Sequence, residues 1–88
     1  MNMNMNIKKT IRKYILENLL FTEDESELQD DESFLDGGII DSTGVMEIIL
    51  FIEESFGFSV NDEEMLPANL DSVNNLATFI QCKQAITA

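Results

Sequence analysis

The chain has 88 residues, which is enough for one small domain built around one hydrophobic core. With 17 Asp and Glu against 5 Lys and Arg its formal net charge is -12, and a surface this acidic repels nucleic-acid phosphates and anionic lipid while favouring protein partners with basic faces. A hydrophobic content of 44% excludes a disordered acidic tail, and the lack of His together with a single Cys excludes His-based triads, most His/Cys metal sites and an internal disulfide.

The opening residues carry no recognisable targeting signal. No apolar run approaches the roughly 20 residues that span a bilayer, and the opening MNMNMNIKKT lacks the apolar stretch of a signal peptide. We therefore expect a cytoplasmic protein that binds neither membranes nor nucleic acid.

The first predicted element is an amphipathic helix from about residue 5 to residue 20, preceded by a frayed end at about residues 1–5. Its apolar positions recur at helical spacing: Ile7, Ile11, Tyr14 and Ile15. The first sixteen residues hold four of the five bases and no acid: Lys8, Lys9, Arg12 and Lys13. These bases form either a solvated helix face or a functional asymmetry of charge. A start before Asn6 is also open, because two lysines in a first turn would oppose the helix dipole.

A long loop is predicted for residues 22 to 41, which lack a helical pattern and carry eight acids before Gly37. Loops longer than about 12–15 residues are uncommon in compact domains and are often functional. The spacing of a calcium-binding EF-hand loop is missing, so no calcium site is predicted. The apolar residues expected to anchor the loop to the core are Leu28, Phe34, Leu35, Ile39 and Ile40.

The strongest helical pattern follows Asp41, whose carboxylate is placed to accept backbone N–H bonds from the first turn. Gly57 is typical of a residue that ends a helix. One apolar stripe is expected to face the core: Val45, Ile48, Ile49, Ile52 and Phe56.

Two further helical segments complete the chain. Asn61 or Asp62 is placed to cap a short helical turn that Pro67 would stop, and Asp71 or Ser72 is placed to cap a last helix. The apolar face of that last helix holds Val73, Leu76, Ala77 and Ile80. The chain is thus predicted to be all-α: a small four-helix bundle of three longer helices and one short one, with a long first loop, in a single domain over residues 1–88.

The helix that begins near Asp41 has a second stripe, rotated by about half a turn from the core stripe. This stripe is both apolar and acidic: Thr43, Met46, Glu47, Leu50 and Glu54. Met46 and Leu50 are either scattered surface hydrophobic residues or the centre of a docking patch.

Ser42 lies in the first turn of the same helix. Nucleophilic catalysis would need a base, and the chain has no His and no Lys near Ser42 in sequence, which argues against a serine hydrolase. A helix N-terminus suits a phosphate ester, because free N–H groups and the helix dipole both favour an anion. No catalytic residue and no metal site is predicted.

The run Gly38-Ile39-Ile40-Asp41-Ser42-Thr43-Gly44 resembles the G-x-[x]-D-S-[LM]-[x] signature of acyl and peptidyl carrier proteins. The following VMEIILFIEESFGFSVNDEEM resembles the second helix of these carriers and the loop beyond it. Length, acidity, the four-helix layout and the long first loop agree, so the resemblance covers essentially the whole chain.

The resemblance implies that Ser42 is esterified by 4'-phosphopantetheine, which a separate transferase takes from coenzyme A. The terminal thiol of the arm would carry an acyl or aminoacyl group as a thioester, so the protein would be a carrier and not an enzyme. In this family the aspartate before the serine helps the transferase to position its metal and coenzyme A, a role that falls on Asp41. The face where carriers meet partner enzymes corresponds to the second stripe together with Glu53: Thr43, Met46, Glu47, Leu50, Glu53 and Glu54.

Two positions depart from the family pattern. Thr43 stands where Leu or Met is usual, and Gly44 follows it at a cost in helix propensity of about 1 kcal/mol. With the PANLDS segment before the last helix, the chain looks closer to stand-alone carriers loaded by a dedicated adenylating ligase, including aminoacyl and D-alanyl types.

The expected partners of a monomeric carrier of this kind are the phosphopantetheinyl transferase, an acyl- or aminoacyl-adenylating ligase or a synthase, and a downstream acyltransferase. The sequence leaves the cargo open. The alternative function is a small acidic protein-interaction module without a prosthetic group.

Overall fold

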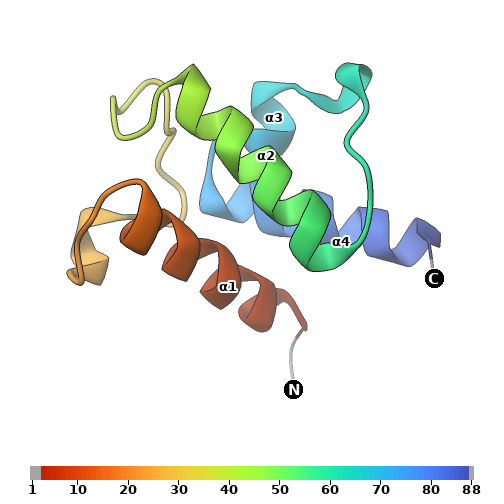
Figure 1. Ribbon diagram of the computed structural model, residues 1–88, viewed down its shortest axis with the longest axis horizontal. Helices are drawn as coiled ribbons and strands as arrows, with labels where there is room; N and C mark the ends of the chain where they lie inside the picture. The colour runs from red at the N-terminus through yellow and green to blue at the C-terminus, as the bar shows by residue number, and fades with distance from the viewer. Residues whose placement is uncertain (1–2, 88) are drawn as a thin grey trace.

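The computed structural model describes residues 3–87 and contains four α-helices and two short 3-10 helices in that range, with no strand. In chain order these are α1 (Met3–Asn18), η1 (Glu25–Glu27), α2 (Ser42–Phe56), η2 (Asp62–Glu64), α3 (Pro67–Leu70) and α4 (Val73–Thr87). Figure 1 shows the long loop leaving one end of α1 and returning to the start of α2, with α3 and α4 closing the other side. The predicted all-α bundle of three longer helices and one short one is confirmed. No helix in the described range is long and apolar enough to cross a membrane.

The helix α1 begins and ends about two residues earlier than predicted. It starts at Met3, so residues 3–5 are helical in the structure, while residues 1–2 of the segment expected to fray lie outside the described range. The earlier start places Lys8 and Lys9 beyond the first turn, where the positive end of the helix dipole no longer opposes them.

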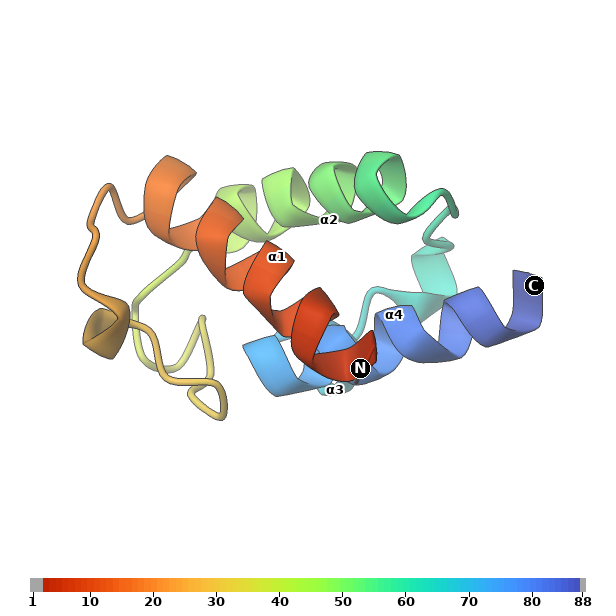
Figure 2. The same ribbon diagram turned by 90° about the horizontal axis from the view of Figure 1, so that it is seen from below.

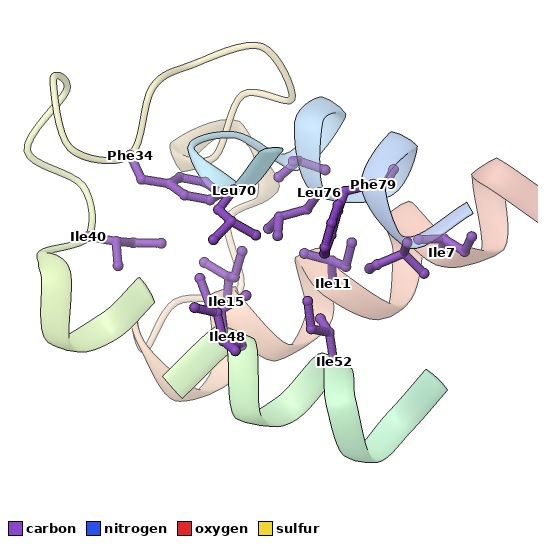
Figure 3. Packing of buried hydrophobic residues seen from close by; sticks show 14 of the residues in the cluster. Ile7, Ile11, Ile15, Phe34, Ile40, Ile48, Ile52, Leu70, Leu76 and Phe79 are labelled. Carbon is purple, nitrogen blue, oxygen red and sulfur yellow. The ribbon is translucent and has the colours of Figure 1, made fainter. Parts of the chain in front are cut away.

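Three helices meet in one hydrophobic core. Figure 2 shows α1 crossing α2 and α4, and Figure 3 shows side chains from all three converging. The predicted stripes are buried: Ile7, Ile11 and Ile15 of α1, Ile48, Ile49 and Ile52 of α2, and Val73, Leu76, Ala77 and Ile80 of α4. Val45 and Phe56, at the two ends of the α2 stripe, are half-buried and pack against the edge of this core.

The long loop is held to the core by three buried side chains, Leu28, Phe34 and Ile40, as predicted. Ile39 is half-buried and packs against the same cluster. The prediction for Leu35 is wrong, since 48% of it is exposed. The backbone turns directly after Phe34, where Gly37 N donates to Ser33 O and Ile39 N donates to Phe34 O. Figure 3 shows the ring of Phe34 directed into the core.

Arg12 also ties the loop to α1. Its guanidinium donates to the backbone oxygens of Leu28 (2.6 Å) and Glu25 (2.8 Å) and to Asp30 Oδ1 (2.7 Å). The interpretation of these bases as a solvated helix face is therefore wrong for Arg12, whose side chain is mostly buried. Lys9 and Lys13 are exposed. One cation thus neutralises part of the charge of a loop that would otherwise repel the acidic body.

The segment before α4 differs in detail from the prediction. Asn61 caps η2, but Pro67 does not stop a helix: it is the first residue of α3, where a missing N–H costs nothing. Ser72 caps α4 through a hydrogen bond from Asn75 N to its Oγ (3.1 Å). Asp71, the other candidate cap, is used elsewhere, as described below.

The carboxylate of Glu64 joins η2 to α4. It accepts from Asn61 N (3.0 Å) and from Lys83 Nζ (2.9 Å), and Lys83 also lies 5.9 Å from the centre of the Phe58 ring. The backbone hydrogen bond from Asn61 and then Lys83 hold the pKa of Glu64 below its ordinary value of 4.5.

Because the pKa of Glu64 is lower in the folded than in the unfolded chain, its stabilisation is present above about pH 4.5 and is lost as pH falls through the folded pKa. We expect Glu64→Gln to lower Tm at pH 7 and to make Tm less dependent on pH between about pH 5 and pH 3. Thermal melts over this range check it. The matched control is Glu63→Gln, at an exposed neighbour. Equal slopes for Glu64→Gln and wild type would contradict the assignment.

Candidate functional site

Ser42 is the first residue of α2 and is exposed. Asp41 caps the helix as predicted: its backbone is extended (φ -87, ψ -179) and its Oδ1 accepts from Gly44 N at 2.8 Å. The backbone N–H groups of Ser42 and Thr43 make no hydrogen bond within residues 3–87. The first turn therefore carries the hydroxyls of two exposed residues, Ser42 and Thr43, and two backbone donors without a partner in the fold.

The approach to Ser42 is fixed by a tight turn. The N–H groups of Ile39 (3.0 Å) and Ile40 (3.3 Å) both donate to Phe34 O, and Gly38, directly before Ile39, adopts the left-handed conformation with φ 67. Gly38 is needed there because side chains with a Cβ rarely adopt this conformation.

Asp71 fastens this turn to the α3–α4 junction. Its carboxylate accepts from Ser33 Oγ and from Leu35 N (3.1 Å), and its backbone oxygen accepts from Phe34 N at 2.8 Å. Nothing in the sequence indicated a role for Ser33, and Asp71 was expected only as a candidate cap. No local pattern signals a contact between residues so far apart in the chain.

Close packing against Ile40 explains why a glycine stands at position 44, where helix propensity disfavours it. Gly44 is buried, and a Cβ built at this position would lie 2.4 Å from the Cγ2 methyl of Ile40. The glycine therefore lets the end of the loop lie against the first turn of α2.

The outward face of α2 carries the second stripe. Its members are all exposed: Thr43, Met46, Glu47, Leu50 and Glu54. Met46 is 48% and Leu50 61% exposed, and Glu47 and Glu54 stand on the same face. This is an apolar strip edged by carboxylates, close to Ser42 along the same helix.

Glu53, the remaining residue expected on the partner face, is less exposed than these five. It is half-buried, and its Oε2 accepts from Val60 N at 2.8 Å, so it holds the loop that follows α2. The prediction placed Glu53 with the partner-binding residues, but the structure gives its carboxylate an internal role.

Tyr14 connects α1 to α2 through an aromatic contact. Its ring stacks on Phe51, with centroids 4.0 Å apart. Burial raises the pKa of the Tyr14 phenol, and the nearby charge of Glu47 raises it further. The phenol is thus neutral at physiological pH and places an aromatic surface beside Glu47.

Two recesses flank the start of α2. A cavity of about 490 Å³ lies on the α1 side and includes Asp41, Thr43 and Glu47 in its lining. A smaller apolar recess of about 120 Å³ lies on the α3 side, lined in part by Leu35, Val45 and Leu66. No group of three or more metal-binding side chains occurs among the described residues, 3–87.

The chain is similar to carrier proteins over most of its length. Residues 9–80 match the family described as the phosphopantetheine attachment site. A D-alanyl carrier protein of Streptococcus suis is 36% identical over 76 residues, which is 86% of this chain and 92% of that protein. An acyl carrier protein of Micrococcus luteus is 39% identical over 62 residues, 70% of this chain and 74% of that protein.

Solved structures include a similar fold. The solution NMR structure of a holo acyl carrier protein from Nitrosomonas europaea superposes with a TM-score of 0.72 at 26% identity, covering 89% of this chain and 95% of that one. The resemblance first carried by residues 38–44 therefore extends to the arrangement of the helices.

The packing of Gly44 leads to a prediction that opposes helix propensity. Alanine would gain about 1 kcal/mol of propensity, but overpacking against the branched side chain of Ile40 costs about 1–3 kcal/mol. We expect Gly44→Ala to lower the free energy of unfolding by roughly 1 kcal/mol, measured by urea denaturation. Thr43→Ala, one residue away but exposed, is the control and should stay within about 0.5 kcal/mol of wild type. A stabilised Gly44→Ala protein would contradict the packing argument.

Proposed function

The chain belongs to the phosphopantetheine-attachment family of carrier proteins, and from this premise we propose that Ser42 is the residue that bears the arm. A protein of this family is a carrier and not an enzyme: it holds acyl groups on a 4'-phosphopantetheine arm. It depends on a phosphopantetheinyl transferase and on synthase or ligase partners. The open question is which residue and which surfaces serve these roles.

The observation that carries the proposal is the position of Ser42 compared with the other serines. Ser33 donates to Asp71, Ser26 donates to Asp24, and Ser72 is buried as a helix cap. Ser55 and Ser59 are exposed but lie near the C-terminal end of α2, where the helix dipole disfavours an anion. Ser42 alone combines an exposed hydroxyl with a helix N-terminus.

The start of α2 fits the phosphate through which the arm would be attached. The free N–H groups of Ser42 and Thr43 are suitable donors for phosphate oxygens. Asp41 Oδ1 is held by Gly44 N, so its charge is partly neutralised by a backbone donor. When attached, the arm supplies a terminal thiol that carries the cargo as a thioester, and this chain supplies a rigid and accessible point of attachment.

We further propose that the cargo is a small group, of the aminoacyl kind. The apolar recess beside α2 has a volume of about 120 Å³, well below the roughly 300–1,000 Å³ of a pocket for a drug-sized ligand. The cavity of about 490 Å³ on the α1 side is lined by the carboxylates of Asp41 and Glu47, which disfavour an apolar acyl chain. The similarity to a D-alanyl carrier protein supports the same choice. A D-alanine-adenylating ligase is then the first loading partner to test, followed by an acyltransferase that receives the cargo. The proposed setting is a single-domain monomer in the cytoplasm.

The first prediction concerns attachment. Incubation with a broad-specificity phosphopantetheinyl transferase and coenzyme A should raise the intact mass of the protein by about 340 Da. Ser42→Ala should show no gain, while its helical circular dichroism should remain that of wild type because Ser42 is exposed. A Ser42→Ala protein that still gains the mass would overturn the assignment. A wild type that stays unmodified, under conditions that modify other carriers, would favour the alternative of an interaction module without a prosthetic group.

The second prediction concerns the outward face of α2. Met46→Ala and Leu50→Ala should slow loading of the modified protein by the ligase about threefold to tenfold, because they remove the centre of an apolar contact. Their free energies of unfolding should stay within about 0.5 kcal/mol of wild type, as for other surface positions. Glu47→Lys and Glu54→Lys should slow association and weaken its salt dependence, since rim acids steer a basic partner.

The control for this set is Ile49→Ala on the buried face, which should lose about 2–5 kcal/mol of stability. Loading rates and melting curves are measured on the same variants. Met46 and Leu50 variants that load at the wild-type rate, or that melt as low as Ile49→Ala, would contradict the two-face assignment. If the ligase does not load wild type, the cargo proposal fails, and transferase rates on the same variants still test the face.

A further inference from the structure

Asp71, at the junction of α3 and α4, is a half-buried carboxylate without a cation beside it. Its oxygens accept from Ser33 Oγ and from Leu35 N, the latter at 3.1 Å. The ion pairs among the described residues are made by Arg12 and Lys83, and neither base pairs with Asp71. A carboxylate has about four acceptor sites. Two neutral donors therefore leave part of its hydrogen-bonding capacity, and its whole charge, without a counterpart in the fold.

Asp71 is also the charged residue in the lining of the apolar recess on the α3 side of α2, whose volume is about 120 Å³. The other lining residues are all apolar: Leu35, Val45, Met65, Leu66, Pro67 and Leu70. Leu35 and Leu66 are exposed, so solvent reaches the recess. The recess thus combines a small apolar surface with one negative charge.

The recess is close to the point of attachment. Val45 stands three residues after Ser42 on α2, a spacing that places two side chains on neighbouring turns of one helix face, about 5–6 Å apart. A group held on a flexible arm at Ser42 can therefore turn back onto the recess without leaving the surface of the domain.

We propose that Asp71 recognises an aminoacyl cargo: its carboxylate binds the ammonium group of the cargo, and the carbon skeleton of the cargo lies in the recess. The proposal rests on attachment at Ser42 and on the aminoacyl cargo, and it adds a specificity-determining residue that lies outside the outward face of α2. At neutral pH an α-amino group is mostly protonated, and a hydrogen bond from an ammonium to a carboxylate is stronger than one between neutral groups. The ammonium supplies the cation that Asp71 lacks in the fold.

Charge and size select this cargo over other acyl groups. A cargo with a carboxylate of its own would be repelled by Asp71. An uncharged acyl group would gain apolar contact but leave the charge of Asp71 unpaired, and the volume of the recess favours a short group over a long acyl chain. A small group with one positive charge next to its carbonyl satisfies both features.

The test compares two cargoes that differ only in the amino group. A transferase that accepts acyl-coenzyme A attaches either a D-alanyl or a propionyl arm, and the intact mass confirms each product. The N–H of Leu35 donates to Asp71 Oδ1, so its amide resonance in two-dimensional NMR spectra reports on that carboxylate. The Leu35 resonance should differ between the D-alanyl and propionyl forms, because only the D-alanyl group carries an ammonium.

Hydrolysis of the thioester, which releases the free acid and the thiol of the arm, is the second readout. The D-alanyl thioester should hydrolyse about threefold to tenfold more slowly on wild type than on Asp71→Asn, because the bound cargo is shielded from water. The propionyl thioester should hydrolyse at the same rate on both proteins. The matched control is Asp36→Asn, which removes the same charge from an exposed residue of the long loop that does not line the recess, and it should leave both rates unchanged.

A further variant separates recognition from folding. Ser33→Ala removes the hydroxyl that donates to Asp71 and keeps the carboxylate. Its Tm should fall, while the ratio of the D-alanyl to the propionyl hydrolysis rate should remain that of wild type. If Asp71→Asn does not fold, the Leu35 resonance of the two wild-type forms and the ratio on Ser33→Ala still decide the question.

Each outcome has one meaning. Equal Leu35 resonances for the two wild-type forms, or equal D-alanyl hydrolysis rates on wild type and Asp71→Asn, overturn the proposal while Ser42 remains the attachment residue. A Ser33→Ala protein that reproduces the rates of Asp71→Asn assigns Asp71 to the fold and also overturns the proposal. Protection of both cargoes to the same extent assigns the recess to apolar contact alone and overturns the role of Asp71. A wild type that gains neither arm, under conditions that modify other carriers, overturns the proposed function itself.

Discussion

The rest of the structure depends on how the acidic loop between α1 and α2 is attached to the remainder of the chain, which is itself acidic overall. The loop between α1 and α2 carries eight acidic residues before Gly37, and charge repulsion alone would drive it away from the remaining acidic surface. Arg12 draws its first half onto α1, and Asp71 holds its second half through Ser33 and the backbone of Phe34 and Leu35. The ring of Phe34, at the second attachment, is fully buried and holds this half of the loop against the core.

The orientation of Ser42 follows from that closure. The turn at Phe34 and Gly38 brings Ile40 against the first turn of α2, and Gly44 leaves the space for it. Asp41 then caps the helix and holds its first turn in place. An exposed serine on a rigid turn is what a separate enzyme needs as a substrate, because a mobile hydroxyl would lose conformational freedom on binding.

The helix α2 carries the core residues on one face and the proposed partner surface on the other. Its inner face supplies Ile48, Ile49 and Ile52 to the core, while its outer face carries exposed apolar and acidic residues that the fold does not use. Such a division allows the partner surface to change without loss of the fold. Phe21, where the chain leaves α1, is a second exposed apolar residue that the fold does not need: its ring is 80% exposed and its backbone is strained, with φ 53.

Features that depend on neighbours along the chain could be predicted from the sequence. The helical stripes, the cap at Asp41, the end of α2 at Gly57 and the position of Ser42 at a helix start all follow from spacings of a few residues, because helix geometry and capping are local. The resemblance to carrier proteins likewise rests on a short run and its flanking helix. These features were enough to predict the fold class and the carrier function.

Contacts between distant segments were decided only by the tertiary structure. Asp71 holds the long loop and does not cap α4, and Glu53 holds the loop that follows α2. Leu35 is exposed, and Pro67 begins α3 where it was expected to stop a short helical turn. In each case the competing roles are equally compatible with the local sequence, and the choice depends on which backbone groups the folded chain brings within hydrogen-bonding distance. The exposure and strain of Phe21 have the same origin, since its conformation is set by how the chain must turn to leave α1.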